Sequence, residues 1–386
     1  MNIEQLREQI NGIDTELLRL FKERMEVAEQ VGKYKKANSL PIMDRGRERE
    51  ILYRLCEEAE NPKLERLIRS VFSSLFDASR FYQRLEFEGE GKSSKLQKTI
   101  DCAMDTTPQK FPSRETVACV GAEGAYAQIA CCKLFDLAGI NYFKNFESVF
   151  KAVHGGLCRY GVVPLVNSTA GSVNEVYNLL NKYGMYIVRG IKLPVNHVLL
   201  ANKGAKMGDI KEVISHYQAI DQCRKFLNAH TDDQDFTIIG YENTATAAKY
   251  VANSGRGDLA AIASRDCAEL YGLSILSDDI QNMSNNHTHF ICISKELEIY
   301  AGANKTSLTF TIEDEVGSLY NVLSKFELYG INLTKLESRP VHGENLLFKF
   351  YVDMDTPVFS EEFKQLLFEL ERETKDFRYL GTYQEL

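Results

Sequence analysis

The sequence predicts three parts of different fold class: an all-helical segment at residues 1–88, an α/β segment at 116–295 and an α+β segment at 304–386. Apolar residues recur with helical spacing through the first part, and short apolar runs alternate with helical stretches in the second. The third reads strand, helix, strand, strand, helix, strand, which is the order of a ferredoxin-like fold. Residues 89–115 are polar and lose this periodicity, which predicts a linker.

The composition indicates a soluble globular protein, with 44% hydrophobic and 26% charged residues. The net charge of −8 argues against general binding to nucleic acid. The first residues lack the apolar core of a signal peptide, and no apolar run could span a bilayer, so we expect a cytoplasmic protein with no membrane partner. The nine cysteines form no CxxC pair and no ligand set, so we expect reduced structural thiols, no metal and no cofactor.

The first helix carries a heptad seam of apolar residues that predicts packing against another helix along much of its length. Arg24 interrupts this seam, and a buried arginine needs an anionic partner. Lys35 lies eleven residues further on, so it points within about 20° of Arg24 and lies roughly 16 Å along the axis. A charge run is usually a solvated face. Two cations on one inward face instead predict a socket for a small anion.

The second and third helices also turn polar on their inward faces. Asp44, Arg47 and Glu48 follow helical spacing at the start of the second helix, on the side of its apolar residues. Ser79 and Gln83 continue the apolar stripe of the third helix. Any one of these features could be a satisfied buried polar pair, but the three together favour a binding site.

The stretch "LREQINGIDTELLRLFKERMEVAEQVGKYK…PIMDRGREREIL" resembles the all-helical chorismate mutase family over nearly all of residues 1–88. The resemblance implies an intertwined dimer in which Arg7 reaches the partner's site. It implies that chorismate, a dianion, rearranges to prephenate without a proton, nucleophile or metal, held in a reactive conformer and stabilised at its ether oxygen. Lys35 and Gln83 are expected to donate to that oxygen, and Glu48 to accept the ring hydroxyl. The implied binding residues are Arg7, Arg24, Lys35, Asp44, Arg47, Glu48, Ser79 and Gln83.

The middle segment places polar clusters after predicted strands, in "ACVGAEGAYAQIA", "GVVPLVNSTAGSV", "SHYQAIDQC" and "NNHTHF". In this order they resemble prephenate dehydratase over roughly residues 116–294. The resemblance implies two α/β lobes, as in periplasmic binding proteins, with the site in the cleft. It implies that Thr288 assists the departing hydroxyl. The implied substrate-binding residues are Asn167, Ser168, Thr169, Ser172, Gln222, Thr288 and Phe290, and His216 and Gln218 also match.

Three positions of the middle segment depart from the family pattern. Val166 stands where the family has glutamate, His289 where it has arginine, and Asn282 where it commonly has aspartate. The first two could be the paired loss of one ion pair, and a protonated His289 could supply a cation. Two interpretations stay open: an active but altered dehydratase, or a mutase that carries an inactive dehydratase-like module for regulation.

The stretch "EDEVGSLYNVLSKFELYGINLTKLESRPV" resembles the ACT regulatory domain. The alternative is a plain ferredoxin-like dimerisation module. The resemblance implies that L-phenylalanine binds at Gly317, Ser318, Leu319, Asn332, Leu333, Glu337, Ser338, Arg339 and Pro340. The whole sequence therefore predicts a bifunctional enzyme that converts chorismate through prephenate to phenylpyruvate. We expect feedback inhibition by phenylalanine and a homo-oligomer, either a dimer or a dimer of dimers.

Overall fold

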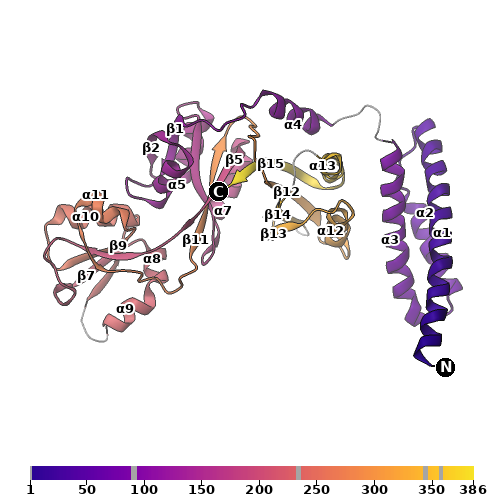
Figure 1. Cartoon of the computed structure of the whole chain (residues 1–386), viewed down its shortest axis with the longest axis horizontal. Helices are drawn as coiled ribbons and strands as arrows, with labels where there is room; N and C mark the ends of the chain where they lie inside the picture. The colour runs from indigo at the N-terminus through magenta and orange to yellow at the C-terminus, as the bar shows by residue number, and fades with distance from the viewer. Residues whose placement is uncertain (1, 88–93, 232–235, 342–346, 356–359) are drawn as a thin grey trace. The chain divides into compact units, whose positions relative to one another are not determined.

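The computed structural model describes residues 2–87, 94–231, 236–341, 347–355 and 360–386 (Figure 1). The chain divides into two compact units, Met1–Ser94 and Lys95–Leu386. No helix within the described residues is long and apolar enough to cross a membrane. All nine cysteines are free, and most of them are buried.

The first unit consists of three helices, α1 (Ile3–Ala37), α2 (Arg45–Glu58) and α3 (Pro62–Phe87). Helix α1 begins at a capping box between Asn2 and Gln5, and α3 packs against both other helices. The buried apolar residues are few and include Met25, Ala28 and Phe76. Most of the α1 seam is exposed, at Ile3, Leu6, Ile10, Ile13, Leu17 and Leu20. Within one chain, this apolar row therefore has no partner among the described residues.

The second unit begins with α4 (Lys95–Thr106), inside the segment that the sequence predicts to be a linker. These residues of the predicted linker form a helix. Ile100 and Ala103 of α4 are buried, and Asp101 lies 3.1 Å from the ammonium group of Lys364 on α13 (Glu361–Glu373). The helix forms because its short apolar stripe has a second helix to pack against.

The first lobe of this unit is a mixed sheet covered by helices, with two separate hydrophobic clusters on its two faces. The strand order is β5-β11-β3-β1-β2, with β11 antiparallel to both of its neighbours and β4 paired to β3. Its strands are β1 (Arg114–Val120), β2 (Leu137–Phe143), β3 (Tyr160–Asn167), β4 (Gly171–Ser172), β5 (Tyr186–Pro194) and β11 (His287–Ser294). Its helices are α5 (Tyr126–Leu134), α6 (Phe146–His154) and α7 (Asn174–Tyr183).

The second lobe is a five-stranded sheet in the order β10-β6-β9-β7-β8. Its strands are β6 (Val198–Ala201), β7 (Glu212–Ser215), β8 (Thr237–Gly240), β9 (Leu259–Ala263) and β10 (Ser274–Ser277). Its helices are η1 (Met207–Asp209), α8 (Tyr217–Gln222), α9 (Arg224–Thr231), α10 (Thr244–Ser254) and α11 (Asp266–Tyr271). The chain passes between the lobes twice, and the two crossing segments meet where the Val195 amide donates to the Asn286 carbonyl (2.8 Å). The predicted two-lobed α/β architecture is confirmed.

The last part contains β12 (Lys305–Glu313), α12 (Ser318–Leu328), β13 (Leu333–Pro340), β14 (Leu347–Asp355), α13 and β15 (Lys375–Glu385). The strand order β13-β14-β12-β15 confirms the predicted ferredoxin-like plan. The end of β15 runs parallel to β5, beside Arg189 and Gly190, so this sheet continues into that of the first lobe (Figure 1). Strand β13 forms the free edge of the described sheet.

Candidate active sites

The helical unit holds Arg24 of α1 against the polar end of α3. The Arg24 guanidinium donates to the Ser79 hydroxyl and to the Leu75 carbonyl (3.4 Å), and it lies 5.7 Å from the ring centroid of Phe76. Ser79 and Gln83 are buried, and Gln83 Oε1 has no hydrogen-bond partner among the described residues. Burial lowers the pKa of Arg24, and the charge of Glu48 partly offsets this. The Arg24 guanidinium and the Gln83 amide, whose oxygen has no partner among the described residues, thus lie at the same polar end of α3.

Lys35 and Asp44 line an open pocket of about 600 Å³ together with Leu40, Pro41 and Met43. The Lys35 ammonium donates to the Ile42 carbonyl (2.6 Å), and the Asp44 carboxylate accepts from the Arg47 amide (3.0 Å) as the N-cap of α2. Asp44 therefore also has a structural role, because it satisfies a free N–H group at the start of the helix.

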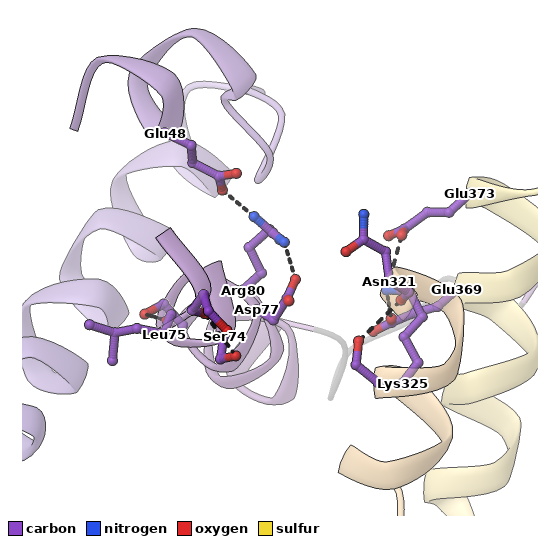
Figure 2. Close-up of polar contacts among 12 residues, drawn as sticks. Glu48, Ser74, Leu75, Asp77, Arg80, Asn321, Lys325, Glu369 and Glu373 are labelled. Atoms are coloured by element: carbon purple, nitrogen blue, oxygen red, sulfur yellow. Dashed lines mark hydrogen bonds and ion pairs between the residues drawn. The ribbon is translucent and has the colours of Figure 1, made fainter. Parts of the chain in front are cut away.

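Glu48 of α2 is linked to α3 by Arg80, whose guanidinium also contacts Asp77 (Figure 2). Arg80 is not among the site residues predicted from the sequence. The available signal was its position directly after Ser79, at the polar end of the inward stripe of α3.

Two of the predicted mutase residues are not brought to this face. Arg47 is exposed and pairs with Glu50 on its own helix (2.7 Å). Arg7 is exposed on α1, far along the chain from Arg24. A single chain therefore gathers the Arg24, Glu48, Ser79 and Gln83 side chains but leaves out both of these arginines.

Asn167, at the end of β3, organises the polar cluster of the two-lobed unit. Its Nδ2 donates to Asn286 Oδ1 (2.9 Å) and to Thr288 Oγ1 (2.9 Å). Its Oδ1 accepts from the Thr169 hydroxyl (2.7 Å) and the Ala170 amide (2.9 Å). Because both ends of the amide are bonded, its orientation is fixed, and it holds the 169–170 turn against β11.

Gln222, at the end of α8, joins this cluster from the second lobe. Its amide nitrogen donates to the Thr169 hydroxyl (2.8 Å), and its oxygen accepts from Asn286 Nδ2 (3.1 Å). His197 is not among the site residues predicted from the sequence, and its Nε2 lies 2.9 Å from the same oxygen. Burial lowers the pKa of His197, so the neutral ring donates here. The network therefore spans both lobes.

Thr288 is buried beside Asn167. Its hydroxyl oxygen accepts from Asn167, and the hydroxyl proton has no acceptor among the described residues. The geometry therefore leaves one hydrogen-bond donor available for a bound molecule.

Ser168 and Phe290 have other surroundings. The Ser168 hydroxyl donates to the Asn285 carbonyl (3.0 Å) and accepts from the His287 amide (2.9 Å), which ties the loop after β3 to the start of β11. Phe290 is fully enclosed in the core of the first lobe. The structure thus gives Phe290 a packing role.

Asn282 and His216 organise the second lobe around Gln222. Asn282 donates to the Asp221 carbonyl (3.0 Å) and accepts from the Lys225 amide (2.9 Å), so it anchors a crossing segment to α8 and α9. His216 is the N-cap of α8 and accepts from the Gln218 amide (3.4 Å). Both residues therefore fix the ends of α8, the helix that carries Gln222.

Val166 and His289, two departures from the family pattern, are direct partners across β3 and β11. Because side chains alternate along a strand, His289 lies on the opposite face from Thr288. There its ring is tilted against that of Tyr383, with the centroids 6.5 Å apart, and it fits because residue 190 is glycine: a Cβ atom at Gly190 would lie 2.8 Å from His289 Nε2.

The structure does not favour a protonated His289 as the source of a cation near pH 7. Burial lowers the pKa of His289 to about 4, so the ring is neutral near pH 7. Glu385 Oε1 lies 3.2 Å from His289 Nε2, and its charge raises the pKa of His289 only in part, because Lys192 and Lys305, at 2.7 Å from the other carboxylate oxygen, lower it again. The two departures from the family pattern thus form one cross-strand pair on the face opposite Thr288, whose hydrogen bond comes from Asn167.

Ser172 contacts the C-terminal sheet. Its hydroxyl donates to the Glu337 carboxylate and accepts from the Lys335 ammonium (3.0 Å). Burial alone would raise the pKa of Glu337, but the hydrogen bonds from Ser172 and Arg339 and the charge of Lys335 lower it to about 2. The guanidinium of Arg339 also lies over the ring of Tyr177 on α7. Two predicted effector residues therefore face the first lobe.

The other predicted effector residues lie at opposite ends of the C-terminal sheet. Gly317, with φ +91°, caps α12 just after the end of β12. The end of β13 at Pro340 lies at this same end of the sheet, whereas Asn332 and Leu333 precede and begin β13 at the other end. Within one chain, the Gly317–Leu319 turn and Asn332 are separated by the length of the strand.

Two family models match the chain, chorismate mutase type II over residues 6–84 and prephenate dehydratase over residues 117–298. The chain is also 31% identical to the bifunctional chorismate mutase/prephenate dehydratase of Enterobacter agglomerans, over 98% of this chain and 95% of that protein. The chain belongs to the bifunctional chorismate mutase/prephenate dehydratase family. The sequence-based assignment is confirmed, and both segments that hold the polar clusters lie inside the matched ranges.

Solved structures resemble the second unit. The prephenate dehydratase of Arthrobacter aurescens in complex with L-Phe is 27% identical, with a TM-score of 0.62, over 70% of this chain and 90% of that one. A structure described as GqqA, a novel type of quorum quenching acylase, is 28% identical, with a TM-score of 0.63, over 70% of this chain and 98% of that one. The same fold therefore occurs in proteins described by different activities.

Proposed function

We propose that the helical unit converts chorismate to prephenate and that the two-lobed unit converts prephenate to phenylpyruvate. The observation that carries this proposal is that each segment matched by a family model contains its own polar cluster, Arg24 with Ser79 and Gln83 in the first and Asn167 with Thr288 in the second. The experiment is to give the purified full chain chorismate or prephenate and follow each product. Turnover of chorismate without formation of phenylpyruvate from prephenate would remove the second activity.

In the mutase reaction, the chain would act by holding and stabilising its substrate. The Arg24 guanidinium binds a carboxylate, since arginine pairs well with planar anions. Lys35 and the Gln83 amide donate to the ether oxygen, where negative charge develops. Glu48 accepts the ring hydroxyl and so selects the compact conformer that reacts. No proton transfer or covalent intermediate is required.

The mutase unit is proposed to work as a dimer. Its small core and the exposed row of apolar residues along α1 support this proposal. In a symmetric dimer, the same row of a second copy would pack against this row and remove it from water. Arg7 lies on that helix with no site in its own chain, and a second copy would let it reach the partner's cluster. Whether two such dimers associate further depends on the other unit.

In the dehydratase reaction, Thr288 is proposed to donate its free hydroxyl proton toward the departing hydroxyl group. Prephenate loses its ring carboxylate as carbon dioxide and its hydroxyl, with one proton, as water, and the ring becomes aromatic. Asn167 holds Thr288 from behind, and Thr169 and Gln222 present further polar groups from both lobes. A positioned donor at the leaving group contributes on the order of 10²–10⁴ in rate.

The rival function is a mutase with an inactive dehydratase-like module. In the sequence, the departures from the family pattern at Val166 and His289 favour this rival function. Their position on the opposite face from Thr288 supports the active enzyme instead, because the donor cluster does not depend on them. Asn282 also keeps its bonds to the Asp221 carbonyl and the Lys225 amide.

The segment 304–386 is proposed to be an ACT domain that senses L-phenylalanine, with 1–88 and 116–295 as the two catalytic domains. The complex of the Arthrobacter aurescens dehydratase with L-Phe supports this. The Ser318 N–H group donates to the Glu315 carbonyl (3.1 Å), which leaves the N–H group of Leu319, in the first turn of α12, as the donor that suits an amino acid's carboxylate. Two antiparallel β13 edges side by side would bring Asn332 and Leu333 of one copy to the Gly317 turn of the other. Ser338 and Pro340 lie along the same edge strand.

A further inference from the structure

Arg80 connects α3 to α2 through two carboxylates. One guanidinium nitrogen contacts Glu48 Oε1 and another contacts Asp77 Oδ1 (Figure 2). Its side chain is 15% exposed, whereas Arg69, which pairs with Glu65 on the same helix, is 48% exposed. A largely buried guanidinium that pairs with two carboxylates fixes their geometry in a way that a solvated surface pair does not.

The contact uses only one oxygen of Glu48. Oε2 of the same carboxylate has no hydrogen-bond partner among the described residues. Because a carboxylate can accept at both oxygens, Oε2 is free to receive a substrate hydroxyl while Oε1 stays bound to Arg80. Asp77 holds the guanidinium in place from its own helix, one turn away.

Arg80 also affects the electrostatic surroundings of Arg24, through Glu48. The charge of Glu48 acts on Arg24, so the two groups lie within electrostatic range. A Glu48 side chain without Arg80 would be drawn toward Arg24 and would neutralise the arginine that the substrate carboxylate needs. Pairing Glu48 with Arg80 keeps Arg24 available.

We propose that Arg80 is a positioning residue of the mutase site, which holds Glu48 so that its second oxygen accepts the ring hydroxyl of chorismate. The inference rests on the proposed mutase function. Arg80 acts through Glu48, not on the substrate. Its contribution comes from fixing a flexible carboxylate before the substrate binds.

The test uses the full chain and compares Arg80→Met with Arg80→Lys, each with Glu48 intact and with Glu48→Gln. Arg69→Met is the matched control. With Glu48 intact, Arg80→Met should lower mutase kcat/KM by about 10- to 100-fold, mostly in kcat, because a charge-assisted hydrogen bond to the carboxylate is lost. Arg80→Lys should restore part of the rate. In the Glu48→Gln background, Arg80→Met should cost less than about threefold, since the partner is already changed.

Equal losses in both backgrounds would show that Arg80 does not act through Glu48 and would overturn the inference. Unchanged mutase activity in Arg80→Met would do the same and leave the proposed function standing. A wild-type chain that does not convert chorismate would overturn both. Dehydratase activity and far-ultraviolet circular dichroism of each variant report on folding. If Arg80→Met does not fold, Asp77→Asn takes its place, with a smaller loss that must also vanish in Glu48→Gln.

Discussion

The Ser172 hydroxyl donates to the Glu337 carboxylate, and this bond joins β4 of the two-lobed unit to the edge strand of the C-terminal sheet. The sequence predicts that Ser172 binds prephenate and that Glu337 binds phenylalanine. The structure connects these two residues directly, and Lys335 contacts both, at 3.0 and 3.1 Å. These contacts therefore connect β13 directly to the segment that follows Asn167.

The first prediction is that Ser172→Ala weakens inhibition by phenylalanine without preventing its binding. A ligand changes activity only through a preference between two conformations, and this bond is where the two parts meet. The phenylalanine concentration for half-inhibition should rise about 5- to 50-fold, within the usual range of allosteric coupling. Calorimetry should still detect phenylalanine. Lys182→Ala, which breaks an exposed ion pair of α7 with Glu147, is the control and should leave inhibition unchanged.

The second prediction concerns Lys35. Lys35→Ala should lower mutase turnover on the order of 10²–10³-fold, because it removes a donor from the ether oxygen. The helical content should not change, since Lys35 is near the end of α1 and its ammonium group donates to a loop carbonyl, that of Ile42. Lys33→Ala, at an exposed pair with Glu29, is the comparison. Chorismate turnover close to that of wild type in Lys35→Ala would contradict the assignment.

The third prediction separates the two activities. Thr288→Ala should abolish the formation of phenylpyruvate from prephenate and spare the conversion of chorismate. Thr288→Ser keeps the hydroxyl and should retain much of the rate, because the donor and its bond from Asn167 persist. His289→Gln, on the other face of β11, should change dehydratase activity little. A large loss in His289→Gln with none in Thr288→Ala would reverse the proposed roles.

The fourth prediction is a pH dependence of stability. The pKa of His289 is about 4 in the folded protein, against 6.5 for an ordinary histidine. Between these values the unfolded chain binds a proton that the folded chain does not, so stability falls as the pH falls from 6.5 to 4. Over this pH range, the free energy of unfolding should fall by about 3 kcal/mol. Urea unfolding of wild type and His289→Gln at pH 7, 6, 5 and 4.5 should show a flatter dependence in the variant; parallel curves would contradict it.

The fifth prediction concerns assembly of the helical unit. Ile13→Lys places a charge in the exposed apolar row of α1, where it would be buried by a second copy. Sedimentation should show the mutase-mediated association weakened, and mutase activity should fall with it, because Arg7 no longer reaches the partner. Glu8→Lys, a change at an exposed polar position of the same helix, should have a smaller effect. Full activity of a dissociated Ile13→Lys chain would refute the shared site.

The sequence alone determined features that depend on local spacing. Ser79 and Gln83 lie one turn apart, so helical periodicity places both on the inward face of α3 before any fold is known. The strand and helix order of residues 304–386 predicts the ferredoxin-like plan in the same way. Asn167 and Thr169 follow a buried strand, and a turn there brings both to its end. Each of these inferences uses residues close together in the chain.

Only the tertiary structure decided which distant residues meet. The register of β11 on β3 places His289 behind the sheet and Thr288 in front of it, and a shift of one residue would exchange them. The pairing of β13 separates Gly317 from Asn332, and the packing of α3 on α2 brings Arg80 to Glu48. Helix α4 forms because α13 covers it. These contacts depend on packing between residues that are far apart in the chain. Such packing leaves no periodic pattern in the sequence, so it could not be predicted from residue spacing.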